Sequence, residues 1–269
     1  MKHMTDILIF LGTLYLLLCT ALYFLQEKLI FFPPLPVDDV YQSVSHNEVR
    51  FMVDNEQLHG WRVEGDSAKK KTILYFGGNA EDVVYLNFEA KEFDVRQCIT
   101  FNHPGYGKST GKPAQQSLYN NALEIYDLVL REYAVKAEDI IVVGRSLGSS
   151  VATYLAANRK ISGLVLITPF DSIKSIASNK YKLFPINYLL KHPFPTIEYI
   201  DQVSASVLML TAVNDEIIAD EHLKNLQLVA GVNKRIIRYA DVGHNTIQTH
   251  HGYYSEINEF ITSLEETVQ

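Results

Sequence analysis

The stretch IIVVGRSLGSSVATYLAA, residues 140–157, decides the fold of this chain. It opens with a short β-branched apolar run, typical of a buried strand, and residues 151–157 predict a helix. Gly144, Ser146 and Gly148 stand between these two elements. A strand, G-x-S-x-G and a helix form the sharp turn that exposes a nucleophilic serine, whereas the pattern alone also occurs in ordinary Gly/Ser turns. Because both flanking elements are present, Ser146 is the candidate nucleophile.

Alternating strands and helices surround this stretch. The pattern predicts a hairpin of residues 49–53 and 58–63, followed by strands at 72–76, 98–101, 163–168, 206–210 and 235–238. Helices are expected at 83–93, 115–133, 217–228 and 253–264. Strands that alternate with helices after an opening hairpin imply an α/β fold, with a mostly parallel sheet covered by helices on both faces.

The N-terminus carries an apolar run, residues 7–25, without a charged side chain. As a helix this run would be about 28 Å long, close to the hydrocarbon thickness of a bilayer. A cleaved signal peptide and a buried core helix are the alternatives, but the run lacks a small-x-small cleavage site and is apolar on every face. We therefore expect residues 1–34 to be a membrane anchor with an interfacial aromatic segment, and residues 35–269 to be one folded domain.

The charges that flank the apolar run give a weak signal of orientation. Lys2 and the amino terminus precede the run, whereas Glu27, Lys28, Asp38 and Asp39 follow it. The positive-inside rule then favours a cytoplasmic N-terminus, with the folded domain on the other side of the membrane.

Composition narrows the classes of partner. The chain has 269 residues and a net charge of −7, so a nucleic-acid partner is not expected. Its two cysteines, Cys19 and Cys98, leave the folded part with one thiol and no internal disulfide. None of the nine histidines has the spacing of a metal-binding motif, so we expect neither a metal nor another cofactor.

Two residues at predicted strand ends are candidate partners for the serine. A serine hydroxyl needs a general base within reach, and the base needs a carboxylate that orients it. In a parallel sheet such groups come from loops at the carboxyl ends of strands. Asp215 follows the strand at 206–210, and His244 follows the strand at 235–238. The order Ser146, Asp215, His244 predicts a catalytic triad, although Asp215 and His244 could each cap a helix instead.

Further residues complete or compete with this triad. Asp171, in the loop after the strand at 163–168, and Asp241, close to the histidine, are the alternative acids. A tetrahedral intermediate would need two N–H donors. Leu147, directly after the nucleophile, is expected to supply one, and Asn79 the other through its backbone, unless the Gly-Gly pair before it is an ordinary turn.

Residues 172–199 are rich in aromatic side chains and prolines. They predict a small lid over the site, with ordinary surface packing as the alternative. A lid this short would leave the site rather open.

Together the motifs resemble the α/β-hydrolase superfamily, in particular its small membrane-anchored ABHD-type (bud-emergence-protein-like) branch. Two places depart from that branch, which usually has histidine where Gly77 stands and Asp-x-Arg where residues 102–104 read Asn-His-Pro. Because those side chains mostly brace loops, altered stability is expected rather than loss of chemistry. The resemblance rests on the anchor with QEKLIFFP (26–33), GGNA (77–80), GYGKSTGKP (105–113), GRSLG (144–148), TPF (168–170), ND (214–215) and GHN (243–245).

The resemblance implies a membrane-anchored serine hydrolase that cleaves carboxylic esters or thioesters through an acyl-enzyme. Its substrates would be lipid-like acyl esters or acylated proteins. An acyltransferase or peptidase that uses the same triad is one alternative. A non-catalytic membrane-bound scaffold that kept the fold is another.

Overall fold

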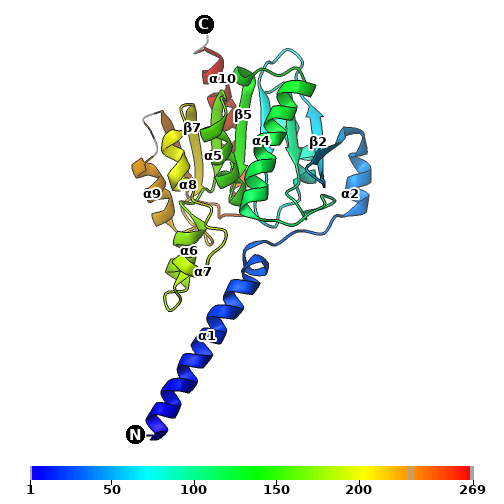
Figure 1. Cartoon of the computed structure of the whole chain (residues 1–269). Coiled ribbons are helices and arrows are strands. Elements are labelled where there is room, and N and C mark those ends of the chain that lie inside the picture. The colour runs from blue at the N-terminus through cyan, green and yellow to red at the C-terminus, as the bar shows by residue number, and fades with distance from the viewer. Residues whose placement is uncertain (1, 230, 232, 267–269) are drawn as a thin grey trace.

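The computed structural model describes residues 2–266 except 230 and 232. Eight strands form one sheet in the order β1-β2-β4-β3-β5-β6-β7-β8, and a long helix, α1 (Lys2–Ile30), projects from the body of the protein (Figure 1). The strands are β1 (Glu48–Val53), β2 (Glu56–Glu64), β3 (Thr72–Phe76), β4 (Gln97–Phe101), β5 (Ile140–Arg145), β6 (Gly163–Ile167), β7 (Ser206–Ala212) and β8 (Lys234–Tyr239).

The sheet is mostly parallel, as the sequence predicts. β1 and β2 form the expected antiparallel hairpin, β2 pairs antiparallel with β4, and every other pairing is parallel. The strand order reverses beside β3, because β4 lies on one side of it and β5 on the other. In open α/β sheets the ligand site lies at the carboxyl ends of the strands next to such a reversal.

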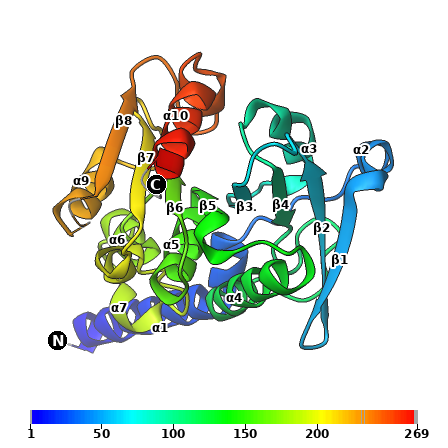
Figure 2. The ribbon, with the colours of Figure 1, turned by 90° about the horizontal axis from the view of Figure 1, so that it is seen from above.

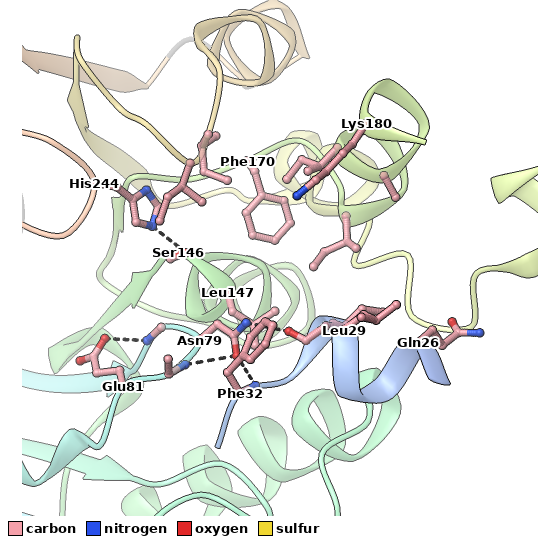
Figure 3. A pocket seen from close by; sticks show the side chains of 18 of the residues that line it. Gln26, Leu29, Phe32, Asn79, Glu81, Ser146, Leu147, Phe170, Lys180 and His244 are labelled. Carbon is pink, nitrogen blue, oxygen red and sulfur yellow. Dashed lines mark hydrogen bonds between the residues drawn. The ribbon is translucent and has the colours of Figure 1, made fainter. Parts of the chain in front are cut away.

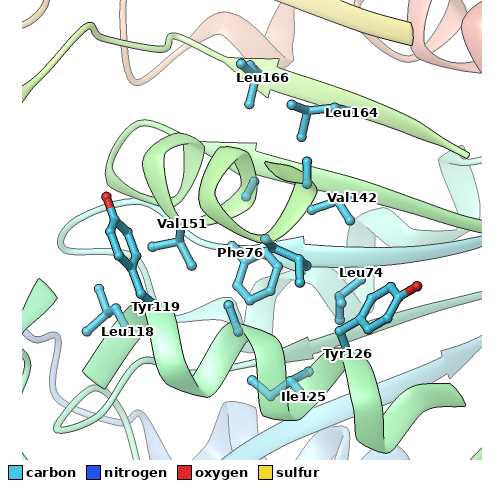
Figure 4. Packing of buried hydrophobic residues seen from close by; sticks show 14 of the residues in the cluster. Leu74, Phe76, Leu118, Tyr119, Ile125, Tyr126, Val142, Val151, Leu164 and Leu166 are labelled. Carbon is cyan, nitrogen blue, oxygen red and sulfur yellow. The ribbon is translucent and has the colours of Figure 1, made fainter. Parts of the chain in front are cut away.

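Helices cover both faces of the sheet, and each face has its own apolar core (Figure 2). Side chains alternate along each buried strand, so Leu74 and Val142 point to one core while Ile73 and Ile141 point to the other. α4 (Gln115–Glu132) and α5 (Leu147–Asn158) pack on the first core, shown in Figure 4, and α10 (Tyr253–Glu266) packs on the second.

Two predicted helices differ from the structure. Residues 83–93 form two 3-10 turns around one short helix, α3 (Leu86–Glu89), because the Asp82 carboxylate accepts the N–H of Val84 and starts the segment as a tight turn. α9 (Asp220–Val229) begins three residues later than predicted, because Asp215 binds the N–H groups that precede it.

The predicted lid divides into two parts. α6 (Ile173–Lys180) and α7 (Ile186–Leu189) project beside α1, and residues 172–192 are called the α6–α7 hairpin below (Figure 1). The remainder belongs to the body, since Phe194 and Thr196 are fully buried and α8 (Thr196–Tyr199) packs against α5.

α1 is long and apolar enough to cross a membrane, with a mean hydropathy of 2.3 in its most apolar window. The aromatic segment after it behaves differently from the expectation. Phe31 is 4% exposed and packs edge-on against His192 and Phe194, so it belongs to the core of the domain rather than to a membrane interface. Phe32 is about half exposed. A short α2 (Asp38–Ser43) then leads into β1.

Candidate active site

The serine turn is built from the end of β5 and the start of α5. Ser146 has φ 49° and ψ −116°, a left-handed conformation that is costly for a residue with a side chain. Its neighbours leave no space for a Cβ: one at Gly144 would lie 2.3 Å from the carbonyl oxygen of Gly148, and one at Gly148 would lie 2.1 Å from that of Phe76. Close packing of main chain against main chain therefore fixes this turn.

Ser146, His244 and Asp215 form one hydrogen-bonded line. Nε2 of His244 lies 3.0 Å from Oγ of Ser146 (Figure 3), and Nδ1 lies 2.8 Å from Oδ2 of Asp215. The other oxygen of Asp215 accepts the N–H groups of Ile217 and Ile218, at 2.9 and 2.7 Å. Because this carboxylate is fixed and can only accept, Nδ1 of His244 carries the proton and Nε2 is left as the base that faces the serine.

The two alternative acids lie elsewhere. Asp171 is buried and binds His222 and Asn225 of α9, at 2.8 and 2.7 Å. Burial alone would raise the pKa of Asp171, but these hydrogen bonds hold it below its usual value. Asp241 is largely exposed, and its carboxylate is 3.5 Å from His250. The structure therefore brings neither carboxylate to His244.

The turn after β3 lies directly beside the serine. A Cβ at Gly78 would lie 3.5 Å from Cβ of Ser146. The N–H of Gly78 is already bound, at 2.7 Å, by the carboxylate of Glu81. Within the described part of the chain, no residue accepts the backbone N–H of Asn79 or of Leu147. These two N–H groups are thus available to an anion that forms at the serine.

The Asn79 side chain ties this turn to the end of α1. Its Nδ2 donates to the carbonyl of Ile30 at 2.6 Å, and its Oδ1 accepts the N–H of Phe32 at 3.0 Å and the hydroxyl of Tyr106 at 2.7 Å. The position of the backbone at residue 79 therefore depends on where the N-terminal helix ends.

Sequence reasoning missed two carboxylates that brace the site. Glu81 binds the N–H of Gly78, the hydroxyl of Tyr75 at 2.7 Å and the guanidinium of Arg145 at 3.4 Å. Glu216 accepts the backbone N–H of His244 at 3.0 Å. The spacing of Glu81, three residues after a glycine turn, is a detectable signal because a carboxylate there can reach back to the N–H. Nothing in the sequence marks Glu216 in this way.

A pocket of about 770 Å³ opens onto the serine, within the size range of small-molecule sites (Figure 3). Its polar residues near the nucleophile include His244, Glu81 and Arg145, while apolar side chains make up most of the remaining wall. The pocket is bounded by α1, by the α6–α7 hairpin and by Phe170. The hydroxyl of Ser146 is therefore part of the wall of a mostly apolar cavity.

Comparison with known proteins bears on the fold and on the relatives of this chain. A family model for the alpha/beta hydrolase fold matches residues 71–193. The chain is 28% identical over 228 residues to alpha/beta hydrolase domain-containing protein WAV2 of Arabidopsis thaliana, covering 75% of this chain and 74% of that protein. It is 27% identical over 199 residues to alpha/beta hydrolase domain-containing protein 17B of Homo sapiens, covering 72% and 67%.

Solved structures show the same fold. An esterase of Pyrococcus furiosus matches with a TM-score of 0.63 and 18% identity, over 87% of this chain and 98% of that one. The family model, the solved structure and the strand order agree that this chain has the α/β-hydrolase fold, and its sequence is similar to proteins of the ABHD type.

Proposed function

We propose that this protein is a membrane-anchored serine hydrolase that cleaves carboxylic ester or thioester bonds through an acyl-enzyme. The observation that carries the proposal is the line of contacts from Ser146 through His244 to Asp215, at 3.0 and 2.8 Å. That arrangement supplies a nucleophile, a base and a group that orients the base.

The reaction follows from these positions. His244 takes the proton of Ser146 as its oxygen attacks the acyl carbon, and Asp215 stabilises the imidazolium that forms. The N–H groups of Asn79 and Leu147 bind the oxyanion. His244 then protonates the leaving alcohol or thiol, which departs and leaves the acyl group on the serine. Water, deprotonated by the same imidazole, releases the carboxylic acid and restores the serine.

The membrane anchor is the second part of the proposal. α1 meets the length and hydropathy of a single span, and its last turns are hydrogen bonded to the domain through Gln26 and Asn79. Because these contacts tie the helix to the folded domain, they favour an anchor that stays part of the protein over a signal peptide that is cleaved off. The flanking charges favour a domain on the non-cytoplasmic side. Protection of the domain from protease in sealed right-side-out vesicles would contradict that orientation.

A fluorophosphonate probe tests the enzymatic proposal. We expect stoichiometric labelling of the wild type and none of Ser146→Ala, with hydrolysis of p-nitrophenyl esters reduced by at least about a thousandfold. Ser67→Ala, at an exposed turn, is the matched control and should keep both the labelling and the ester hydrolysis of the wild type. Absence of labelling in the wild type would favour a non-catalytic scaffold. Formation of an acyl ester or amide when alcohols or amines compete with water would instead identify a transferase.

A further inference from the structure

The last turns of α1 form one wall of the pocket that leads to the serine. Leu22, Gln26 and Leu29 line it from a single face of the helix, at the i, i+4 and i+7 positions. The wall opposite belongs to the α6–α7 hairpin, which contributes Ile176 and Leu189 among others. In Figure 3 the ribbon of α1, with Gln26 and Leu29, lies across the pocket from Lys180 on α6. The pocket is therefore incomplete without the N-terminal helix.

Side-chain contacts hold the hairpin against α1. Gln26 is buried; its Nε2 donates to the carbonyl of Leu189 at 2.9 Å, and its Oε1 accepts the N–H of Lys191 at 2.7 Å. Near the hairpin tip, the hydroxyl of Tyr15 donates to the carbonyl of Leu183 at 2.9 Å. Tyr15 and Gln26 are eleven residues apart, so the hairpin follows α1 for about 16 Å.

This alignment brings the hairpin tip to the level of the apolar run of α1. Tyr15 is in the middle of residues 7–25, so the tip lies beside the part of α1 that would be within a bilayer. Leu183 and Tyr188 of the hairpin are 84% and 87% exposed, which suits contact with lipid. Lys191 lies beside Gln26, just past the end of the apolar run, where a long cationic side chain can reach phosphate headgroups.

We propose that the pocket takes its substrate directly from the bilayer, by passage of an acyl chain between α1 and the α6–α7 hairpin until its carbonyl reaches Ser146. The inference rests on the proposed hydrolase function and narrows the substrate to long, membrane-resident acyl esters or thioesters. The occupant is a hydrocarbon chain because most side chains of both walls are apolar, and because α1 and the hairpin tip also carry exposed apolar side chains that suit contact with lipid. A short soluble ester would fill only the end of the pocket near the serine.

Chain-length selectivity tests this route in the full-length protein reconstituted in phosphatidylcholine vesicles. Leu22→Trp and Leu29→Trp narrow the passage, and we expect kcat/KM for p-nitrophenyl palmitate to fall at least about tenfold, while that for the butyrate stays within roughly twofold. Leu17→Trp is the matched control, since Leu17 is exposed and lies about 140° around the helix from Leu22. An unchanged ratio of palmitate to butyrate rates in both pocket variants would overturn the proposal. Failure of the wild type to hydrolyse either ester would instead count against the hydrolase function itself.

A second measurement does not depend on catalysis. Leu183→Trp places an indole at the hairpin tip, and the natural Trp61 is fully buried in the domain and serves as the baseline. We expect lipids with brominated acyl chains to quench the added fluorescence and to leave the wild-type signal unchanged. An indole at position 183 that is quenched by aqueous iodide and not by brominated lipid would show that the hairpin stays in water, and would exclude entry from the bilayer.

Discussion

The carboxamide of Asn102 donates a hydrogen bond of 2.8 Å to the carboxylate of Asp82. Both side chains are almost fully buried, and the hydroxyl of Tyr41 binds the second oxygen of Asp82 at 2.7 Å. The side-chain oxygen Oδ1 of Asn102 in turn accepts the N–H of Val83. The ABHD-type branch that this sequence resembles usually has aspartate at the position of Asn102. Here Asp82 already supplies a carboxylate. The amide of Asn102 can donate to it and accept the N–H of Val83, so the pair is hydrogen bonded with only one buried carboxylate.

Restoring the usual residue should therefore damage this protein. Asn102→Asp would set two buried carboxylates against each other and remove the donor to Asp82, at a cost of roughly 3 kcal/mol in the free energy of unfolding. The exchange Asp82→Asn with Asn102→Asp returns one carboxylate and one amide to the pair, and should recover most of that loss. Denaturant unfolding of the two single variants and the double variant measures the coupling. Additive effects of the two substitutions would show that the pair is not coupled.

The histidine beside this asparagine predicts a dependence of stability on pH. His103 is buried, and its Nε2 donates to the carbonyl of Gly77 at 3.0 Å, in the turn that precedes Asn79. Burial lowers the pKa of His103 below its usual 6.5, although Gly77 and Glu81 partly oppose this shift. Below about pH 6.5 the unfolded chain therefore binds a proton that the folded protein does not, and stability falls as the pH falls.

Between the lowered pKa of folded His103 and about pH 6.5, we expect this residue to reduce the free energy of unfolding by up to about 1.4 kcal/mol for each unit that the pH falls. Above the pKa of the unfolded chain it should contribute no slope. In His103→Gln the amide can still donate to Gly77 but does not titrate, so this share of the slope should disappear. His59 and His192 are also buried with a lowered pKa, and they should leave a residual slope in the variant. Unfolding free energies at pH 5, 6, 7 and 8 make the comparison. If the free energies of unfolding of the wild type and of His103→Gln change with pH at the same slope, His103 does not contribute to the pH dependence.

Two aspartates at strand ends should respond differently to the same substitution. Asp215→Asn removes the acceptor that fixes the His244 tautomer, and kcat should fall by about 10⁴-fold with little loss of stability. Asp171→Asn should instead cost about 1–3 kcal/mol of stability through its contacts with His222, and leave kcat largely unchanged. Steady-state kinetics and thermal unfolding of both variants separate the roles. If Asp171→Asn lost more kcat than Asp215→Asn, Asp171 rather than Asp215 would be the acid that supports His244.

The sheet and the convergence of Ser146, Asp215 and His244 were predictable from the sequence, because buried strands have a distinctive pattern and parallel strands bring their carboxyl ends to one edge. The helix predicted at 83–93 was wrong, since its apolar spacing fits a helix but the Asp82 carboxylate selects a tight turn locally. Only the structure shows this competition between a side chain and the helical backbone.

The composition of the pocket was not predictable. An apolar N-terminal run indicates a span, but the run carries no sign that Leu22 and Leu29 also line the route to the serine. Phe31 illustrates the same limit: its sequence context suggests a membrane interface, whereas its ring is buried against His192. Both features depend on contacts between segments more than 100 residues apart, to which a local pattern is blind.

Gly148, two residues after the nucleophile, gives a final prediction about what holds the serine turn in place. A Cβ at Gly148 would lie 2.1 Å from the carbonyl oxygen of Phe76, an acceptor on rigid backbone that cannot give way. Gly148→Ala must therefore push the start of α5 away from β3, and with it the N–H of Leu147. We expect kcat to fall by about 10²-fold or more, because a displaced donor no longer meets the oxyanion.

The matched control is Gly231→Ala, where an added Cβ meets no atom within 4 Å. It should leave kcat unchanged, since the position is remote from the serine turn and has space for a methyl group. Ester hydrolysis and fluorophosphonate labelling are measured for both variants beside thermal unfolding. A Gly148→Ala protein that keeps wild-type kcat would mean that the serine turn tolerates displacement, and that the close packing of β3 against α5 does not set the position of the oxyanion donors.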